Sequence, residues 1–194
     1  MKTLLTALLI LLLTAPAWAT DYYVDADAAG GGDGTTTDLT GSHCAFKTIA
    51  EVEAGVSAGS HTVYFQRGDT WPDELTVVAG VTYDAYGTGD APIIDANDDV
   101  NRCFYGNDVD NVTIKNFHLK NAEYHYIMNV DGDNWTIDSV QFTCDIVSSS
   151  NANGIYCNST GAAHSDITVN NSLHKTSESD CSETVYINSA MYSV

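Results

Sequence analysis

The feature that most constrains this chain is an internal repeat. The segment 104–114 aligns with 127–137 at a shift of 23 residues, and Asp, Asn, Thr and Ile positions of the two copies coincide. A looser third copy follows at 165–169. Units this short cannot bury an apolar face alone, so we expect them to stack as successive coils of a parallel β-solenoid. A leucine-rich repeat has a similar period, but its Leu-x-x-Leu-x-Leu pattern is missing.

A second repeated series ends each time in Asn, at Asn129, Asn158 and Asn188, with spacings of 29 and then 30 residues. Because side chains alternate along a strand, each copy should have an inward and an outward row. The inward positions are apolar: Tyr126, Ile155 and Val185, followed by Met128, Cys157 and Ile187. The outward row is then Ile127, Tyr156 and Tyr186, beside the three Asn.

Other local signals fit an all-β chain with one short helix. The sequence has 15 Gly and only 3 Pro among many Asn, Asp, Ser and Thr, which is a turn-rich composition. Thr48 and Glu51 form a capping box, and apolar residues follow at helical spacing. Gly55 and Gly59 should limit this helix to about two or three turns. Short β-type runs begin soon after it, at 62–65, 75–78 and 81–83.

The N-terminus predicts export. Residues 1–19 combine Lys2, an apolar run and the small-x-small sequence Ala17-Trp18-Ala19, which is the pattern of a cleaved signal peptide. The run is about ten residues, well below the ~20 that span a bilayer. We therefore expect a secreted or periplasmic protein, cleaved near Ala19, in a compartment where disulfides persist.

We divide the chain into three parts. These are a signal peptide (1–19), a strand, glycine-rich loop and capping helix (20–60), and solenoid coils (61–194). Because the sequence stops at Val194 within a coil and without a cap, we expect further coils to follow it in the natural protein.

Several segments together resemble the right-handed parallel β-helix proteins, the superfamily of pectate lyases and other polysaccharide-cleaving enzymes. They are Tyr22–Asp25, Asp33–Thr35, Phe46–Ile49, Phe65–Trp71, Leu75–Val77, Val81–Gly87 and Pro92–Asp95. Ala45 departs from this pattern, since a Pro commonly precedes the Phe-Lys-Thr-Ile element. The resemblance implies a right-handed parallel β-helix with a short N-terminal helical cap. It is poorly specific for activity, because the fold carries lyases, hydrolases, epimerases and non-catalytic surface proteins.

The resemblance implies a calcium-dependent polysaccharide lyase as the first functional hypothesis. Calcium would neutralise a uronate carboxylate, and a base, usually Lys or Arg in this superfamily, would take the C5 proton. The candidate bases near the longer loops are Lys120, His125 and Lys175. The candidate calcium ligands are Asp145, Asp180 and Glu183, together with Asp131 and Asp133 of the first repeat. Asp131 and Asp133 also fit ordinary turn chemistry.

Two other classes remain open. A glycoside hydrolase would use a pair of carboxylates, which the same loops could supply. Its paired-Asp and Gly-His-Gly motifs are absent, which favours the lyase. A non-catalytic, adhesin-type solenoid could bind glycans without cleaving them. In each case Tyr156, Tyr186, Asn158 and Asn188 are candidate substrate-binding residues, with cross-coil packing and an Asn ladder as the structural alternatives.

The charge narrows the partners. With 26 acidic and 7 basic residues the chain carries a formal charge of −19. This excludes a basic face for nucleic acid. It would also repel a polyuronate, so we expect a polysaccharide that is neutral or bridged by calcium, bound by a monomer.

The five cysteines are an odd number for an exported protein, so at least one should be unpaired. Cys157 falls in the inward row and should be a buried thiol. Cys144 and Cys181 lie in longer loops of adjacent coils and are the candidate disulfide. Cys44 with Cys103 is a weaker alternative.

Overall fold

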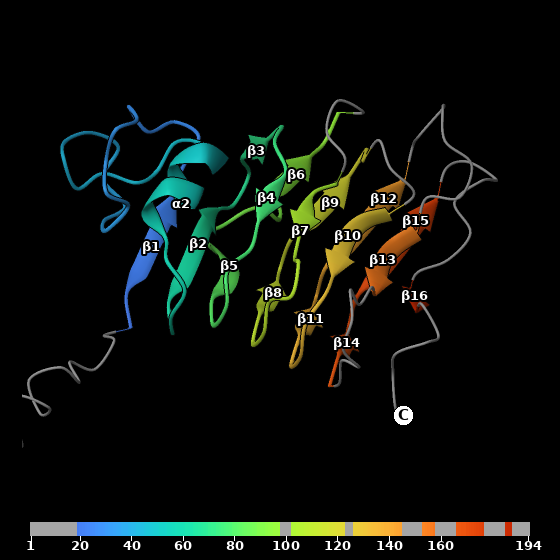
Figure 1. The fold of residues 1–194 in the computed structure, drawn as a ribbon. Coiled ribbons are helices and arrows are strands. Elements are labelled where there is room, and N and C mark those ends of the chain that lie inside the picture. The colour runs from blue at the N-terminus through green and yellow to red at the C-terminus, as the bar shows by residue number, and fades with distance from the viewer. Residues whose placement is uncertain are drawn as a thin grey trace, which may run out of the picture.

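The computed structural model describes residues 19–97, 102–122, 126–144, 153–157, 166–176 and 185–187. Its strands lie in three sheets in which every pairing is parallel. The chain passes from sheet A to sheet B to sheet C and back to sheet A, so one visit to each makes a coil (Figure 1). The described part of the chain is therefore an all-β parallel solenoid with one short helix, while the right-handed winding stays a prediction.

The strands are short, as expected for a solenoid. Sheet A contains β1 (Asp21–Val24), β2 (Thr62–Gln66), β5 (Thr82–Tyr86), β8 (Thr113–Lys115), β11 (Thr136–Asp138) and β14 (Thr168–Asn170). Sheet B contains β3 (Thr70–Trp71), β6 (Ile93–Asp95), β9 (His118–Lys120), β12 (Gln141–Cys144) and β15 (Leu173–Thr176). Sheet C contains β4 (Leu75–Thr76), β7 (Phe104–Tyr105), β10 (Tyr126–Val130), β13 (Asn153–Cys157) and β16 (Val185–Ile187).

The shift of 23 residues holds in sheet A and fails by one residue in sheet C. Ile114 pairs with Ile137, as the repeat predicts. Phe104, however, pairs with Met128 and not with Ile127. The connection from sheet C to sheet A is one residue shorter in the second of these coils, and this removes the difference before the chain reaches sheet A.

Corners between sheets A and B explain much of the Asn content. Asn116, Ser139 and Asn171 follow β8, β11 and β14 and have positive φ angles of 65°, 55° and 46°. Asn adopts this region more readily than most residues. The side chain of Asn116 also donates to Asp84 (2.6 Å), and that of Asn171 donates to Asp138 (2.9 Å). These polar residues therefore shape the corners and tie each coil to the preceding one.

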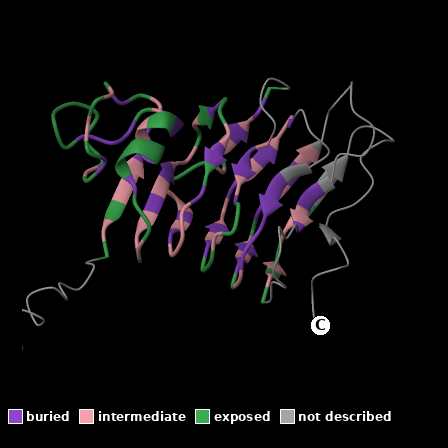
Figure 2. Cartoon of the chain, viewed as in Figure 1, coloured by how far each residue is buried: buried purple, intermediate pink, exposed green. Residues whose placement is uncertain are grey.

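The core lies inside the coils, where apolar residues of the three sheets meet (Figure 2). Phe65, Phe104 and Phe117 are fully buried, and Phe117 contacts the other two rings edge-on at 5.2 Å and 5.3 Å. Met128, Ile155 and Cys157 are buried as well, which confirms the inward side of the second series. Cys44 and Cys103 are buried free thiols, so the weaker pairing alternative is wrong.

Helix α2 (Ile49–Gly55) covers the N-terminal end of the coils (Figure 1). Thr48 accepts from the backbone of Glu51, and Glu51 accepts from the backbone of Thr48, so the capping box is present as predicted. Ile49 and Val52 are buried against the core, and the Trp71 indole donates to the carbonyl of Lys47 (3.0 Å). Within the described ranges, no helix is long and apolar enough to cross a membrane.

Candidate functional site

One outward row of sheet B collects two of the predicted basic residues. Backbone register places Asp95, Lys120, Thr143 and Lys175 opposite one another on four successive strands. Since adjacent strands are ~4.8 Å apart, Lys120 and Lys175 belong to positions ~10 Å apart along the solenoid. The described part of Lys175 is its backbone, and His125 lies outside the described residues.

Lys120 forms an ion pair with Asp95, with 2.9 Å between Nζ and Oδ2. Asp95 also accepts from the Asn121 side chain (2.8 Å) and from the Asn97 backbone (3.1 Å). Burial raises the pKa of Asp95, but Lys120, Asn121 and Asn97 outweigh it, so that pKa lies below its ordinary value. The first function of this Lys120 ammonium is to hold a neighbouring coil, and its role as a base stays a prediction.

A second group beside Lys120 was not singled out in the sequence. His118 is the other outward residue of β9, and its Nε2 lies 2.8 Å from the Thr143 hydroxyl and 3.2 Å from the Gln141 amide. Alternation in His118-Leu119-Lys120 was the available signal, since it puts residues 118 and 120 on one face. We define the sheet B patch as Asp95, His118, Lys120, Gln141 and Thr143.

Sheet C presents an outward row of a different kind. Register aligns Thr76, Tyr105, Asn129, Tyr156 and Tyr186, and we call the last four the sheet C row. The Arg102 guanidinium lies 4.1 Å from the centre of the Tyr105 ring and is held there by Glu74 (2.9 Å). The Asn129 side chain, which is almost fully buried, donates to the carbonyl of Gly106.

The predicted alignment of this row needs one correction. Tyr156 pairs with Tyr186 as expected, but it pairs on its other side with Asn129 and not with Ile127. The predicted Asn129–Asn158 ladder is therefore wrong, because Asn129 is not a turn residue and bonds within its own sheet. The displacement is two residues, so it changes the pairing and leaves the inward and outward faces unchanged.

An Asn ladder does exist at another corner. The Asn134 side chain donates to the Asn111 carbonyl oxygen (3.1 Å), and both residues have positive φ angles. This corner belongs to the repeat that was recognised first, at the connection between sheets C and A. Asn158 and Asn188 themselves lie outside the described residues.

Asp131 and Asp133 lie at this same corner, immediately after β10. Asp131 is fully buried, and its carbonyl accepts from the backbone of Val109 (2.8 Å). The backbone of Asp133 donates to the Asp110 carboxylate (2.8 Å), which joins successive turns. Within the described ranges, no three His, Cys, Asp or Glu side chains are arranged to hold a metal ion. The other predicted calcium ligands, Asp145, Asp180 and Glu183, lie outside those ranges, as does Cys181 of the predicted disulfide.

Three basic side chains of the coils are paired with carboxylates of the preceding coil. Besides Lys120–Asp95 and Arg102–Glu74, Lys115 contacts Asp84 at 3.1 Å. In each pair both side chains are at most 38% exposed. Positive charge on these faces is therefore already matched, and the atoms available to a ligand are hydroxyls, amides and aromatic rings.

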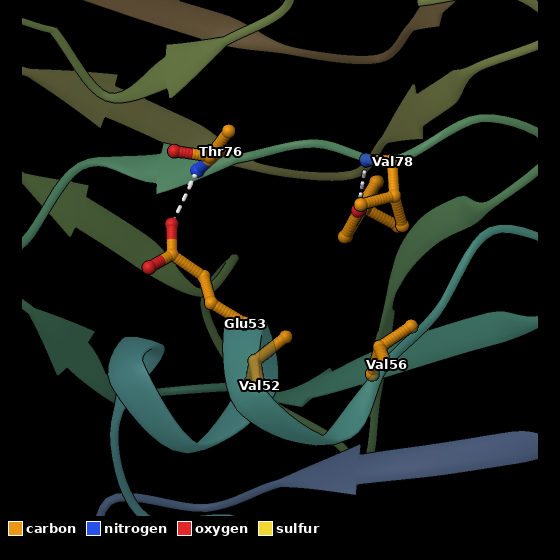
Figure 3. A pocket seen from close by; sticks show the side chains of 6 residues that line it. Val52, Glu53, Val56, Thr76 and Val78 are labelled. Carbon is orange, nitrogen blue, oxygen red and sulfur yellow. Dashed lines mark hydrogen bonds between the residues drawn. The ribbon is translucent and has the colours of Figure 1, made fainter.

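Cavities lie away from both rows, at the N-terminal end. One of about 210 Å³ separates helix α2 from β4 and is lined by Val52, Glu53, Val56, Thr76, Val78 and Tyr83 (Figure 3). It faces the outer edge of sheet C. Glu53 accepts from the backbone of Thr76 (2.7 Å), and the Tyr83 hydroxyl accepts from the backbone of Val78 (3.1 Å). Side chains thus satisfy the donors that a further strand would otherwise bind.

Comparison with known proteins gives one structural likeness. No protein-family model matches the chain, and no curated protein sequence does. Among solved structures, the native GH136 lacto-N-biosidase from Eubacterium ramulus is similar, with a TM-score of 0.64 and 19% sequence identity. The match covers 87% of this chain and 36% of the lacto-N-biosidase chain. It supports the parallel β-helix-like solenoid, and at this identity it concerns the fold alone.

Proposed function

We propose that the chain is part of an exported, carbohydrate-active protein that binds a neutral glycan on the outward faces of sheets B and C and hydrolyses its glycosidic bonds. The observation that carries the proposal is the pairing of Lys120, Lys115 and Arg102 with carboxylates. A polyuronate needs positive charge at its binding face, and these pairs leave little on the described coils. A neutral glycan needs only hydroxyl, amide and aromatic partners.

The sheet C row offers such partners in a regular array. Tyr105 and Tyr156 are half-buried outward residues on either side of Asn129. Aromatic side chains provide apolar area at low conformational cost, with a hydroxyl at the edge. The GH136 lacto-N-biosidase is a glycoside hydrolase with a similar fold, which is consistent with hydrolysis. The two catalytic carboxylates would come from the loops between sheets B and C.

A calcium-dependent lyase is the second candidate. It is favoured by the position of Lys120 and Lys175 in one row of sheet B, two strands apart. In that reaction calcium, held by the predicted loop carboxylates, would neutralise the uronate. A lysine of the row would then remove the C5 proton.

The test is a comparison of substrates with the secreted full-length protein. Neutral oligosaccharides and a polyuronate are each incubated with and without calcium. New reducing ends and the ultraviolet absorbance of unsaturated products are both measured. We expect reducing ends from a neutral glycan without unsaturated product. Calcium-dependent unsaturated product from the polyuronate would replace this proposal by the lyase.

A matched pair of variants tests the binding face. Tyr156→Ala should weaken binding of the neutral oligosaccharide about tenfold, since a stacking contact of ~1.4 kcal/mol is removed. Thr113→Ala, an outward residue of sheet A, should leave it unchanged. Equal affinities for the two variants would contradict the assignment of this face.

A further inference from the structure

The N-terminal cap contains a second cavity, larger than the one beneath β4. Its volume is about 390 Å³, and it lies between helix α2 and the glycine-rich loop. Its lining includes Tyr22, Asp33, Thr35, Phe46, Glu51 and Ala54. None of these residues belongs to the sheet B patch or the sheet C row. The volume is at the lower end of the ~300–1,000 Å³ of small-molecule sites, which suits one or two sugar rings.

One side of this cap cavity is aromatic and firmly held. The rings of Tyr22 and Phe46 lie 5.9 Å apart and are nearly parallel, at 20°. Phe46 is 3% exposed, whereas Tyr22 is half-buried and contacts the His61 ring edge-on. Gly55 allows the helix to lie close to this pair, because a Cβ there would overlap the Phe46 ring. The aromatic wall is therefore formed before any ligand binds.

The other side carries two fixed carboxylates. Asp33 accepts from the Thr35 backbone (3.0 Å) and hydroxyl (2.6 Å), and its second oxygen lies 2.6 Å from His43 Nδ1. Glu51 accepts from the backbones of Gly31 (2.8 Å) and Lys47 (2.5 Å). Each carboxylate oxygen has more than one acceptor direction, so such oxygens can take a further donor.

Both carboxylates remain ionised over a wide pH range. Hydrogen bonds from Thr35 and from His43 hold the pKa of Asp33 at about 2. Burial raises the pKa of Glu51, but the backbone N–H groups of Gly31, Lys47 and Thr48 outweigh it and leave that pKa below its ordinary value. The cavity therefore presents acceptors for hydroxyl donors rather than carboxylic acid groups.

Neighbouring basic groups offset the negative charge. His43 contacts Asp33 directly, and the Lys47 side chain interacts electrostatically with Glu51. A rim of acceptors with a small net charge suits a neutral polyhydroxylated ligand better than a metal ion or an ammonium group. It disfavours an anionic ligand as well.

We propose that the cap cavity binds one neutral sugar residue, with its apolar face on Tyr22 and its hydroxyl groups donating to Asp33. This is a second glycan site at the end of the solenoid, separate from the outward faces of sheets B and C. A protein with both sites would hold a glycan at two points, which raises the overall affinity when a linker can span them.

The test uses two substitutions in the same helix. Ala54 is exposed and lines the cavity, and Ala50 is exposed on the same helix one turn earlier and does not line it. Ala54→Leu should fill the cavity without harming the helix, since Leu and Ala both favour helix. Ala50→Leu is the matched control, and thermal unfolding of both variants checks that they fold.

Binding is followed by amide NMR of the ¹⁵N-labelled full chain, titrated separately with galactose, glucose, N-acetylglucosamine and galacturonate. We expect at least one neutral sugar to shift the amides of Thr35 and Ala54, with a Kd of about 1–10 mM, as is reasonable for one small ring. Ala50→Leu should keep this affinity, and Ala54→Leu should lose at least tenfold. Asp33→Asn should weaken binding similarly, against Asp73→Asn as an exposed control.

Three results would overturn the inference. They are no saturable shift at the cap with any neutral sugar, equal affinity of Ala54→Leu and Ala50→Leu, and tighter binding of galacturonate than of the neutral sugars. Each result leaves the sheet C site open, because Tyr156→Ala tests that site independently. Conversely, an unchanged Tyr156→Ala variant contradicts the proposed function and does not affect the cap cavity.

Discussion

The ammonium of Lys120 on β9 lies 2.9 Å from a carboxylate oxygen of Asp95 on β6, one coil earlier. The two residues are adjacent in register, and their side chains are 27% and 18% exposed. The pair is thus partly desolvated, which places its energy between that of exposed and fully buried ion pairs.

Removal of the lysine should therefore lower stability measurably. We expect Lys120→Ala to reduce the free energy of unfolding by about 1–2 kcal/mol in urea titrations, since Asp95 loses its counter-charge. Lys115→Ala is the comparison, because Lys115 is more exposed, at 38%, in its pair with Asp84. A smaller loss is expected there. A Lys120→Ala protein as stable as wild type would mean that this pair contributes nothing.

The same carboxylate should add to acid sensitivity. The pKa of Asp95 is lower in the folded protein than its ordinary value of about 3.8. The stabilisation is therefore present above the unfolded pKa, and it is lost as the pH falls through the lower, folded pKa. Asp95→Asn removes only the charge. The wild-type advantage over this variant should be largest near pH 6 and should shrink below pH ~4. A difference that stays constant from pH 6 to pH 2.5 would rule out this assignment.

Glu53 should protect the outer edge of sheet C. It accepts from the backbone of Thr76 at the cavity beneath helix α2 (Figure 3). Glu53→Ala should cost about 0.5–1.5 kcal/mol in chemical unfolding, since that donor loses its partner in the protein. Glu53→Gln keeps an acceptor and should cost less. If both variants lose the same amount, the hydrogen bond is not the cause.

Cys103 should be unreactive until the protein unfolds. Its thiol is fully buried, and it donates to the carbonyls of Ile94 (3.3 Å) and Lys120 (3.4 Å). Burial raises the pKa of this thiol to about 12, so almost no thiolate exists at pH 8. Peptide mapping after brief alkylation should find Cys103 unlabelled in the native protein and labelled in denaturant. Labelling at equal rates in both would show that the thiol is accessible.

Short-range signals were read correctly from the sequence. The capping box of Thr48 and Glu51 involves residues three apart, and its hydrogen bonds are present. The inward positions of Met128, Ile155 and Cys157 follow from alternation, and all three are buried. The turn preference of Asn116 and Asn171 is also local, and both have positive φ. Each of these features depends on neighbours along the chain.

Pairings across coils were not readable in the same way. Matching Asn129 with Asn158 rested on residue identity, whereas register depends on the length of each connection and on the bond from Asn129 to Gly106. The contact of Lys120 with Asp95 joins residues 25 positions apart, and no motif indicates it. The cap cavity likewise joins Tyr22 to Ala54.

The sequence by itself determined that this chain forms stacked, turn-rich β coils with a helix near the N-terminal end. Repeat period, alternation and capping are local properties, and burial of apolar rows then favours stacking. Only the tertiary structure decided which residue of one coil faces which residue of the next. It thereby decided that Lys120, Lys115 and Arg102 are matched by carboxylates and that Tyr156 lies beside Asn129. The physical reason is that a two-residue change in a connection preserves every inward and outward face while it replaces every neighbour.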